Sequence, residues 1–265
     1  LFQPGYHWLV TLPFFHVSGL ALIWRTLCGG GVLVFPDCSE SLAWNISHHK
    51  PTHISLVSSQ LYALRTRSQE SEQLTKMKAI LVGGGPMSGE LWDQSVARDL
   101  PVYTTYGLSE MASSVTVCDA PIEGTGDVHA GNLLRYLELI IDQEGEILVR
   151  GHTLFLGYAT ENGIQLPLTV SGWFRTGDVG FWDERQKLHL VGRLDLRFIS
   201  GGENIYPEEI EAQLLRVPGV EQAIVVPKTD AKYGARPVAF IRTQEDFAKL
   251  VATVPHILSA HLPKF

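Results

Sequence analysis

Hydroxyl groups and one carboxylate lie close together in the segment Tyr103–Met111, which reads YTTYGLSEM. Mg²⁺ takes oxygen ligands and is often held by one or two carboxylates together with substrate phosphates. Glu110, next to the hydroxyl group of Ser109, is therefore the candidate metal ligand. Alternatively, Glu110 stands in the first turn of a helix, where its charge interacts with the helix dipole.

Three glycines, Gly83, Gly84 and Gly85, follow the apolar run Ala79–Val82. Glycine lets a ligand approach the backbone, and ligand sites in α/β proteins lie at the carboxyl ends of strands. A tight turn between a strand and a helix would use the same residues. The glycines alone therefore do not establish a binding site.

Two later residues have side chains that could bind a nucleotide. Asp178, in the motif FRTGD, could accept hydrogen bonds from both hydroxyls of a ribose. An Asx turn next to Gly177 is the alternative interpretation. Arg193, in the motif GRLD, suits a phosphate or ribose oxygen.

His16 and a pair of glycines complete the candidates. His16 lies in LPFFHVSG, at the end of an expected strand, where a histidine can be functional or a hydrogen-bonded core residue. Gly201 and Gly202 fit a loop that must approach a substrate closely or move.

The composition excludes several classes of protein. With 45% hydrophobic and 18% charged residues among 265, the chain can bury a substantial core. The formal charge of −7, without a Lys/Arg run, argues against nucleic-acid binding. Three cysteines without CxxC spacing predict neither a disulfide framework nor a zinc site, and favour a cytoplasmic location. Arg25 and Gly29–Gly31 interrupt the longest apolar run, Val17–Val34, so we expect no membrane span.

Apolar strands alternate with amphipathic segments in the first part of the chain, which predicts an α/β fold of layered βα sheets. The expected pairs are Trp8–Leu12 with Val17–Leu27, Val32–Phe35 with Leu42–His49, Ile54–Val57 with Gln60–Arg67, Ala79–Val82 with Ser88–Arg98, and Val102–Thr105 with the segment after Ser109.

The pattern becomes rich in strands and turns from Leu137 onward, which predicts a small β subdomain. A small α+β lid domain is expected after Asp195, which gives domains 1–194 and 195–265. Its expected elements are a helix from Pro207, strands Ala223–Val226 and Val238–Ile241, and a helix around Asp246–Leu262.

Six ordered motifs, from Trp8 to about Phe240, resemble the adenylate-forming superfamily of acyl-CoA synthetases. They are LPFFHVSG, GGGP, YGLSE, FRTGD, GRLD and GGENIYPEEIE. Within the superfamily, FFHVSGLALIWRTL, HISLVSSQLYALR, YGLSEMASSV and SGGENIYPEEIE are most similar to o-succinylbenzoate:CoA ligases of menaquinone or phylloquinone biosynthesis. The resemblance implies ATP-dependent ligation of o-succinylbenzoate to CoA through an acyl-AMP, with Mg²⁺ as the metal and a homodimer as the family's assembly.

The resemblance also implies a role for each candidate residue. Gly83, Gly84 and Gly85 would cradle adenine. Tyr106 and Gly107, of the YGLSE motif, would pack against the nucleotide, and Ser109, where most relatives have threonine, would contact the α-phosphate. Glu110 would bind Mg²⁺, Asp178 the ribose hydroxyls, and Arg193 the ribose or phosphate. His16 would line the acyl pocket or the approach of the thiol, and Ser55, Ser59 and Gln60 would be further residues of the pocket. Asp195 would be the hinge that brings Gly201 and Gly202 to the pantetheine tunnel.

Two parts of the family pattern are missing from the 265 residues. They are the Ser/Thr/Gly-rich phosphate loop before the histidine motif and the lysine after Leu262–Phe265, since Lys264 comes too early. A cation at the carboxylate and the α-phosphate stabilises the transition state of adenylation. We therefore expect the chain to be a fragment that is inactive, or nearly so, in adenylation by itself.

Two alternatives stay open at this stage. One is a ligase of the same superfamily that takes another acyl or aryl acid, because hydrophobic pockets separate related acids by only a few kcal/mol. The other is a non-catalytic module that binds an adenylate or CoA. In each interpretation the partners are small molecules, and Glu110, Asp178 and Arg193 should gather around one nucleotide.

Overall fold

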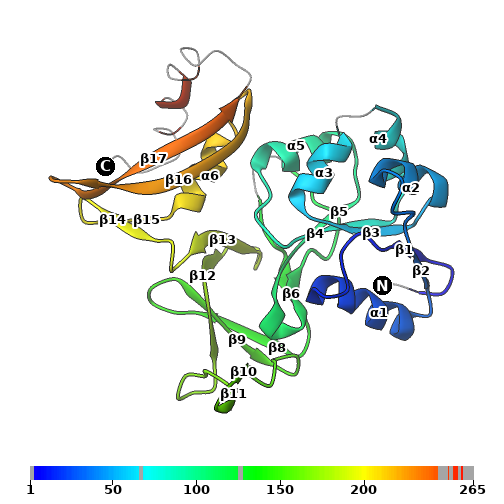
Figure 1. Ribbon diagram of the computed structural model, residues 1–265, viewed down its shortest axis with the longest axis horizontal. Coiled ribbons are helices and arrows are strands. Elements are labelled where there is room, and N and C mark those ends of the chain that lie inside the picture. Colours follow the sequence, from blue (N-terminus) through cyan, green and yellow to red (C-terminus); the bar gives the residue numbers. More distant parts are fainter. Residues whose placement is uncertain are drawn as a thin grey trace.

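The computed structural model describes residues 3–65, 68–124, 128–243, 250, 253–255 and 258. A large α/β part, a β-rich part and a small C-terminal α+β part follow one another along the chain (Figure 1). The predicted fold class is confirmed. The domain boundary at Asp195 stays a prediction.

The large part is built on a seven-stranded sheet in the order β2-β1-β3-β4-β5-β6-β7. Strands β1 to β5 are parallel to one another, whereas β6 is antiparallel to β5 and β7 is antiparallel to β6. The strands are β1 (His7–Leu9), β2 (Val32–Val34), β3 (His53–Leu56), β4 (Ala79–Val82), β5 (Val102–Leu108), β6 (Ser113–Val117) and β7 (Asn132–Leu133). The helices are α1 (Val17–Gly29), α2 (Leu42–His49), α3 (Ser58–Arg65), α4 (Ser68–Thr75) and α5 (Gly89–Ala97).

Two helices of this part, α2 and α5, begin where a serine side chain satisfies a free backbone N–H group. The hydroxyls of Ser41 and Ser88 accept from the amides of Trp44 and Leu91 at the starts of α2 and α5. The apolar faces of these helices pack on the sheet and form a core whose fully buried members include Leu9, Ile54, Ile80 and Trp92. This core holds the carboxyl ends of β4 and β5 in place.

The segment after Ser109 does not form the expected fifth helix, so this prediction is wrong. Ser109–Met111 is a single 3₁₀ turn (η1), and β6 then runs back antiparallel to β5. Ala112 and Ser113 reverse the chain with φ values of 54° and 109°. The residues that follow, Ser-Val-Thr-Val, are rich in β-branched side chains, which pack well on a pleated sheet and override the βα alternation.

The β-rich part is an antiparallel sheet in the order β13-β12-β9-β8, with a separate hairpin, β10 and β11. The strands are β8 (Leu137–Ile141), β9 (Glu146–Gly151), β10 (Tyr158–Thr160), β11 (Gly163–Gln165), β12 (Phe174–Trp182) and β13 (Leu188–Arg193). Asp178 therefore lies within a strand and not in an Asx turn. The strand is irregular there, because Gly177 has φ +73° and the register with β9 shifts between Arg175 and Val179.

The C-terminal part contains β14 (Phe198–Ser200), β15 (Glu203–Ile205), α6 (Pro207–Leu214), β16 (Val220–Asp230) and β17 (Gly234–Thr243). Pro207 opens α6 as predicted, with Glu208 and Glu209 in its first turn. Most of the helix expected around Asp246–Leu262, including its last residues, lies outside the described residues, as does Lys264. Within the described ranges, no helix combines the length and the apolar character that a membrane crossing needs.

Replacement of Trp92 by alanine should show how much the large core contributes to stability. Its side chain is fully buried, and Nε1 donates a 3.0 Å hydrogen bond to the carbonyl of Gly124. We expect Trp92→Ala to lower the free energy of unfolding by about 3–5 kcal/mol, measured by urea denaturation. Trp24→Ala is the control, because Trp24 is 62% exposed and a surface change costs about 0.5 kcal/mol or less. Equal losses in the two variants would contradict the described core.

Candidate functional site

Asp178 is the centre of a hydrogen-bonded cluster that joins two sheets. It lies opposite Arg193 in the register of β12 and β13, and Arg193 Nη1 donates to Asp178 Oδ1 at 3.0 Å. From the large sheet, the hydroxyl of Tyr106 donates to Asp178 Oδ2 at 2.6 Å. Three residues from the motifs YGLSE, FRTGD and GRLD therefore meet at one carboxylate.

The charges of this cluster are well defined. Burial, and then the negative charge of Asp178, raise the pKa of Tyr106, so its hydroxyl stays protonated and acts as a donor. Hydrogen bonds to Asp195 and then to Asp178 raise the pKa of the Arg193 guanidinium. Arg193 is thus a fixed cation beside the carboxylate of Asp178, which accepts hydrogen bonds from two residues.

Arg193 is held in place by more than Asp178. Its Nε and Nη2 donate to the two carboxylate oxygens of Asp195, at 3.0 and 3.3 Å, and Nη1 also donates to the carbonyl of Thr176 at 3.2 Å. Gly177 leaves room for the guanidinium, because a Cβ atom there would lie 3.0 Å from Nη2. The positive φ of Gly177 is a further reason for glycine at this position of the FRTGD motif.

Ser109 and Glu110 follow β5 directly and lie three and four residues beyond Tyr106. Glu110 Oε1 accepts a 2.8 Å hydrogen bond from the hydroxyl of Tyr158. In the described part of the chain, no group of three or more His, Cys, Asp or Glu side chains could hold a metal ion. A single half-buried carboxylate nevertheless fits Mg²⁺ that is bound mainly through phosphate oxygens.

The glycines at the ends of β4 and β5 permit close backbone approaches. A Cβ atom at Gly83 would lie 2.6 Å from Thr105 Cγ2, and one at Gly107 would lie 2.0 Å from the carbonyl oxygen of Ser113. Gly84 has φ +77°, a conformation that favours glycine, whereas Gly85 has open space around it. Gly83 and Gly107 therefore have structural reasons to be glycine in addition to any contact with a ligand.

Among the described residues, no hydrogen bond or ring contact joins the predicted residues of the acyl pocket to this cluster. His16 is exposed at the start of α1, and its ring lies 4.8 Å from that of Phe15. Ser55 is buried in β3, where the structure, within its described residues, gives its hydroxyl no hydrogen-bond partner. Gln60 Oε1 accepts from the amide of Val57 at the start of α3, next to Ser59. The role of these residues in a pocket stays a prediction.

The remaining predicted residues lie in the C-terminal part or just before it. Asp195 is exposed after β13, and Gly201 and Gly202 form the turn between β14 and β15 with φ values of 62° and 93°. The amide of Gly201 donates to the carbonyl of Tyr233, which ties this turn to the loop between β16 and β17. The positions suit a hinge and a close-approach loop, and both roles stay predictions.

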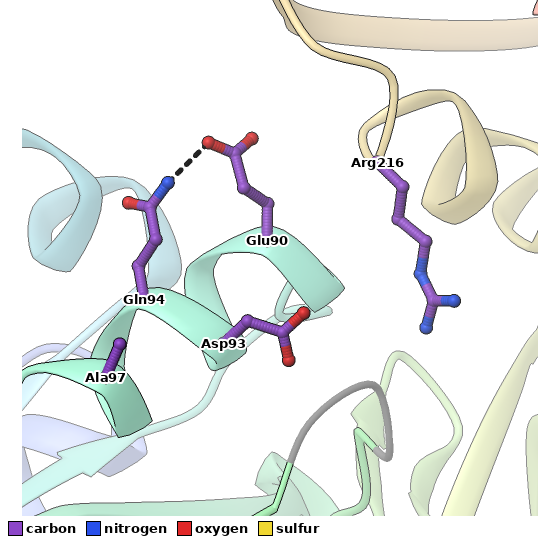
Figure 2. A pocket seen from close by; sticks show the side chains of 5 residues that line it. All are labelled: Glu90, Asp93, Gln94, Ala97 and Arg216. Carbon is purple, nitrogen blue, oxygen red and sulfur yellow. Dashed lines mark hydrogen bonds between the residues drawn. The ribbon is translucent and has the colours of Figure 1, made fainter.

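Two cavities of the molecule lie away from the Asp178 cluster. The larger, of about 400 Å³, is lined by Arg216 and by four residues of α5, Glu90, Asp93, Gln94 and Ala97 (Figure 2). The smaller, of about 120 Å³, lies between the chain after β6 and the β12–β13 region, around Cys118, His129 and Lys187. Neither is lined by Glu110, Asp178 or Arg193, so the expected nucleotide cavity does not coincide with either of them.

Sequence reasoning missed Tyr158 and Thr176 as members of the site. Tyr158 reaches Glu110 across 48 residues of sequence, and nothing in its local pattern marks the contact. Thr176 belongs to the FRTGD motif, and its hydroxyl accepts from the amide of Asp178. A polar residue two positions before a candidate aspartate is the signal that could have identified Thr176.

Comparisons with known proteins agree with these motifs. Residues 2–159 match the family described as AMP-binding enzyme, and residues 209–265 match the AMP-binding enzyme C-terminal domain. A 2-succinylbenzoate--CoA ligase of Haemophilus influenzae is 38% identical over 251 residues, which are 94% of this chain and 53% of that protein. The chain spans about half the length of the curated relatives it matches.

Solved structures give the same result. The o-succinylbenzoate CoA synthetase of Bacillus subtilis in complex with the acyl-adenylate intermediate OSB-AMP superimposes with a TM-score of 0.78 at 28% identity, over 98% of this chain and 55% of that one. The same enzyme in complex with ATP and a magnesium ion gives a TM-score of 0.77 at 29% identity, over 98% of this chain and 56% of that one.

Gly107→Ala should disrupt the turn that carries Ser109 and Glu110. The new Cβ would collide with the backbone of Ser113, which cannot move without a shift of β6. We expect the free energy of unfolding to fall by about 1–3 kcal/mol or more, measured by urea denaturation. Gly85→Ala is the matched control, because no atom lies within 4 Å of its Cβ position. Similar stability of the two variants would refute the described close approach.

Proposed function

Because the chain belongs to the AMP-binding enzyme family, we propose that its protein activates a carboxylic acid as an acyl-adenylate and then transfers the acyl group to CoA. The acid that we propose is o-succinylbenzoate. Relatives named 2-succinylbenzoate--CoA ligase, 38%, 32% and 34% identical, support this choice. So does the likeness to an enzyme solved with OSB-AMP.

The observation that carries the proposal is the Asp178 cluster. A carboxylate offers about four lone-pair positions to hydrogen-bond donors. Tyr106 and Arg193 each use one, so about two remain for the hydroxyls of a ribose. Because Tyr106 and Arg193 come from different strands, the carboxylate is fixed before a nucleotide binds, which lowers the entropic cost of binding.

The proposed reaction has two steps. In the first, the acid's carboxylate oxygen attacks the α-phosphorus of ATP and pyrophosphate leaves; in the second, the thiol of CoA attacks the acyl carbon and AMP leaves. Ser109 would contact the α-phosphate, and Glu110 would hold Mg²⁺, which neutralises charge on the phosphates when bound. Gly83, Gly84 and Gly85 would lie against adenine, at the carboxyl end of β4.

The other assignments are also part of the proposal. His16, Ser55, Ser59 and Gln60 would face the acyl group. Asp195 would act as the hinge between the two steps, and Gly201 and Gly202 would approach pantetheine. We also propose a cytoplasmic location and a homodimer, which rest on composition and on the family resemblance.

The proposal predicts that the 265-residue chain binds a stable acyl-AMP analogue that carries the o-succinylbenzoyl group, measured by calorimetry. Asp178→Asn should weaken this binding about 10- to 100-fold, since a hydrogen bond to a charged group is worth about 1.5–3 kcal/mol. The control is Asp119→Asn, which removes an exposed partner of Lys187 and should leave the affinity unchanged.

Two results would contradict the proposal. Equal binding of the parent chain and Asp178→Asn would remove Asp178 from the nucleotide site. A preference for an analogue with a fatty-acyl group over the o-succinylbenzoyl analogue would keep the reaction class and refute the proposed acid.

A further inference from the structure

The carboxylate of Glu110 has a partner far away in the sequence. The hydroxyl of Tyr158, at the start of β10, donates to Glu110 Oε1 at 2.8 Å. Glu110 is half-buried and Tyr158 is 45% exposed, so the contact lies at the edge of the protein and not in its core. The second oxygen, Oε2, is not used in this hydrogen bond.

A second hydrogen bond ties the same two segments together. The amide of Phe155 donates to the main-chain carbonyl of Glu110 at 2.7 Å. Both the side chain and the backbone of Glu110 are thus held by residues 155–158. A 3₁₀ turn of three residues has few hydrogen bonds of its own, so this external support determines where the carboxylate lies.

Aromatic packing connects this support to the Asp178 cluster. The ring of Phe155 lies 4.8 Å from that of Tyr158 and 5.4 Å from that of Phe174, in edge-to-face arrangements. Phe174 is buried and opens β12, four residues before Asp178. Strand β12 therefore positions Asp178 directly, and it supports Glu110 through the rings of Phe155 and Tyr158.

We propose that Tyr158 is a positioning residue for the metal site: its hydroxyl fixes Glu110 Oε1 and so presents Oε2 to the Mg²⁺ that accompanies ATP. This inference rests on the proposed function, in which Glu110 is the metal ligand. Tyr158 contacts the carboxylate and not the substrate, so it acts only through Glu110.

The chemistry of the pair suits this role. The phenol of Tyr158 donates to Glu110 as a neutral group, so it does not add a negative charge that would compete for the metal. Partners that orient a metal ligand typically change metal affinity or activity about 10- to 100-fold when they are removed. Because this pair is partly exposed, we expect the lower end of that range.

Tyr158→Phe tests the inference, because it keeps the ring against Phe155 and removes only the hydroxyl. Mg²⁺ is titrated calorimetrically into the 265-residue chain saturated with a non-hydrolysable ATP analogue. We expect the half-saturating Mg²⁺ concentration to rise about 10-fold. The affinity for AMP without metal should stay unchanged, which a general loss of structure would not allow.

Tyr136→Phe is the matched control. Tyr136 is 78% exposed in the same part of the chain and stacks on His152, so the loss of its hydroxyl should not affect the Mg²⁺ dependence. An unchanged Mg²⁺ dependence in Tyr158→Phe, or an equal loss of AMP and Mg²⁺ affinity, would overturn the inference.

A Glu110→Gln variant separates this inference from the proposed function. If Glu110→Gln leaves the Mg²⁺ dependence as in the parent, Glu110 is not the metal ligand and the proposed metal role fails. If Glu110→Gln weakens Mg²⁺ binding and Tyr158→Phe does not, only the positioning role is refuted.

Discussion

The arrangement of the site depends on the hydrogen bonds that the carboxylate of Asp178 accepts. It accepts from Tyr106 of the large sheet and from Arg193 of the neighbouring strand in the β-rich sheet. A partly buried carboxylate is costly unless donors surround it, and these two donors offset that cost. The same contacts hold β5 against β12 and β13, so the site and the junction of the two sheets are stabilised together.

Irregular backbone lies next to several of the candidate side chains. The register of β12 with β9 shifts at Gly177, next to Asp178, and the reversal at Ala112 and Ser113 replaces a helix with a short turn that carries Ser109 and Glu110. Bulges are often found next to active sites.

The sequence predicted the regular elements of the large part well. Leu42–His49 and Ala79–Val82 have the expected bounds, because the alternation of apolar strands with amphipathic, serine-capped segments is a local signal. The prediction of a helix after Ser109 was wrong because local β propensity and positive φ values overrode the βα pattern. The alternative interpretation of FRTGD, an Asx turn, does not hold: Asp beside Gly is typical of a turn, yet pairing with β13 places Asp178 in a strand.

The sequence by itself determined the order and chemistry of the motifs, and through them the family, because residue types and spacing are local and can be read without coordinates. Only the tertiary structure decided which of these residues meet. Tyr106 and Arg193 both donate to the carboxylate of Asp178, and Tyr158 holds Glu110 from 48 residues away. His16 and Gln60 make other contacts. Contacts of this kind depend on sheet register and on packing between distant segments, which no short stretch of sequence specifies.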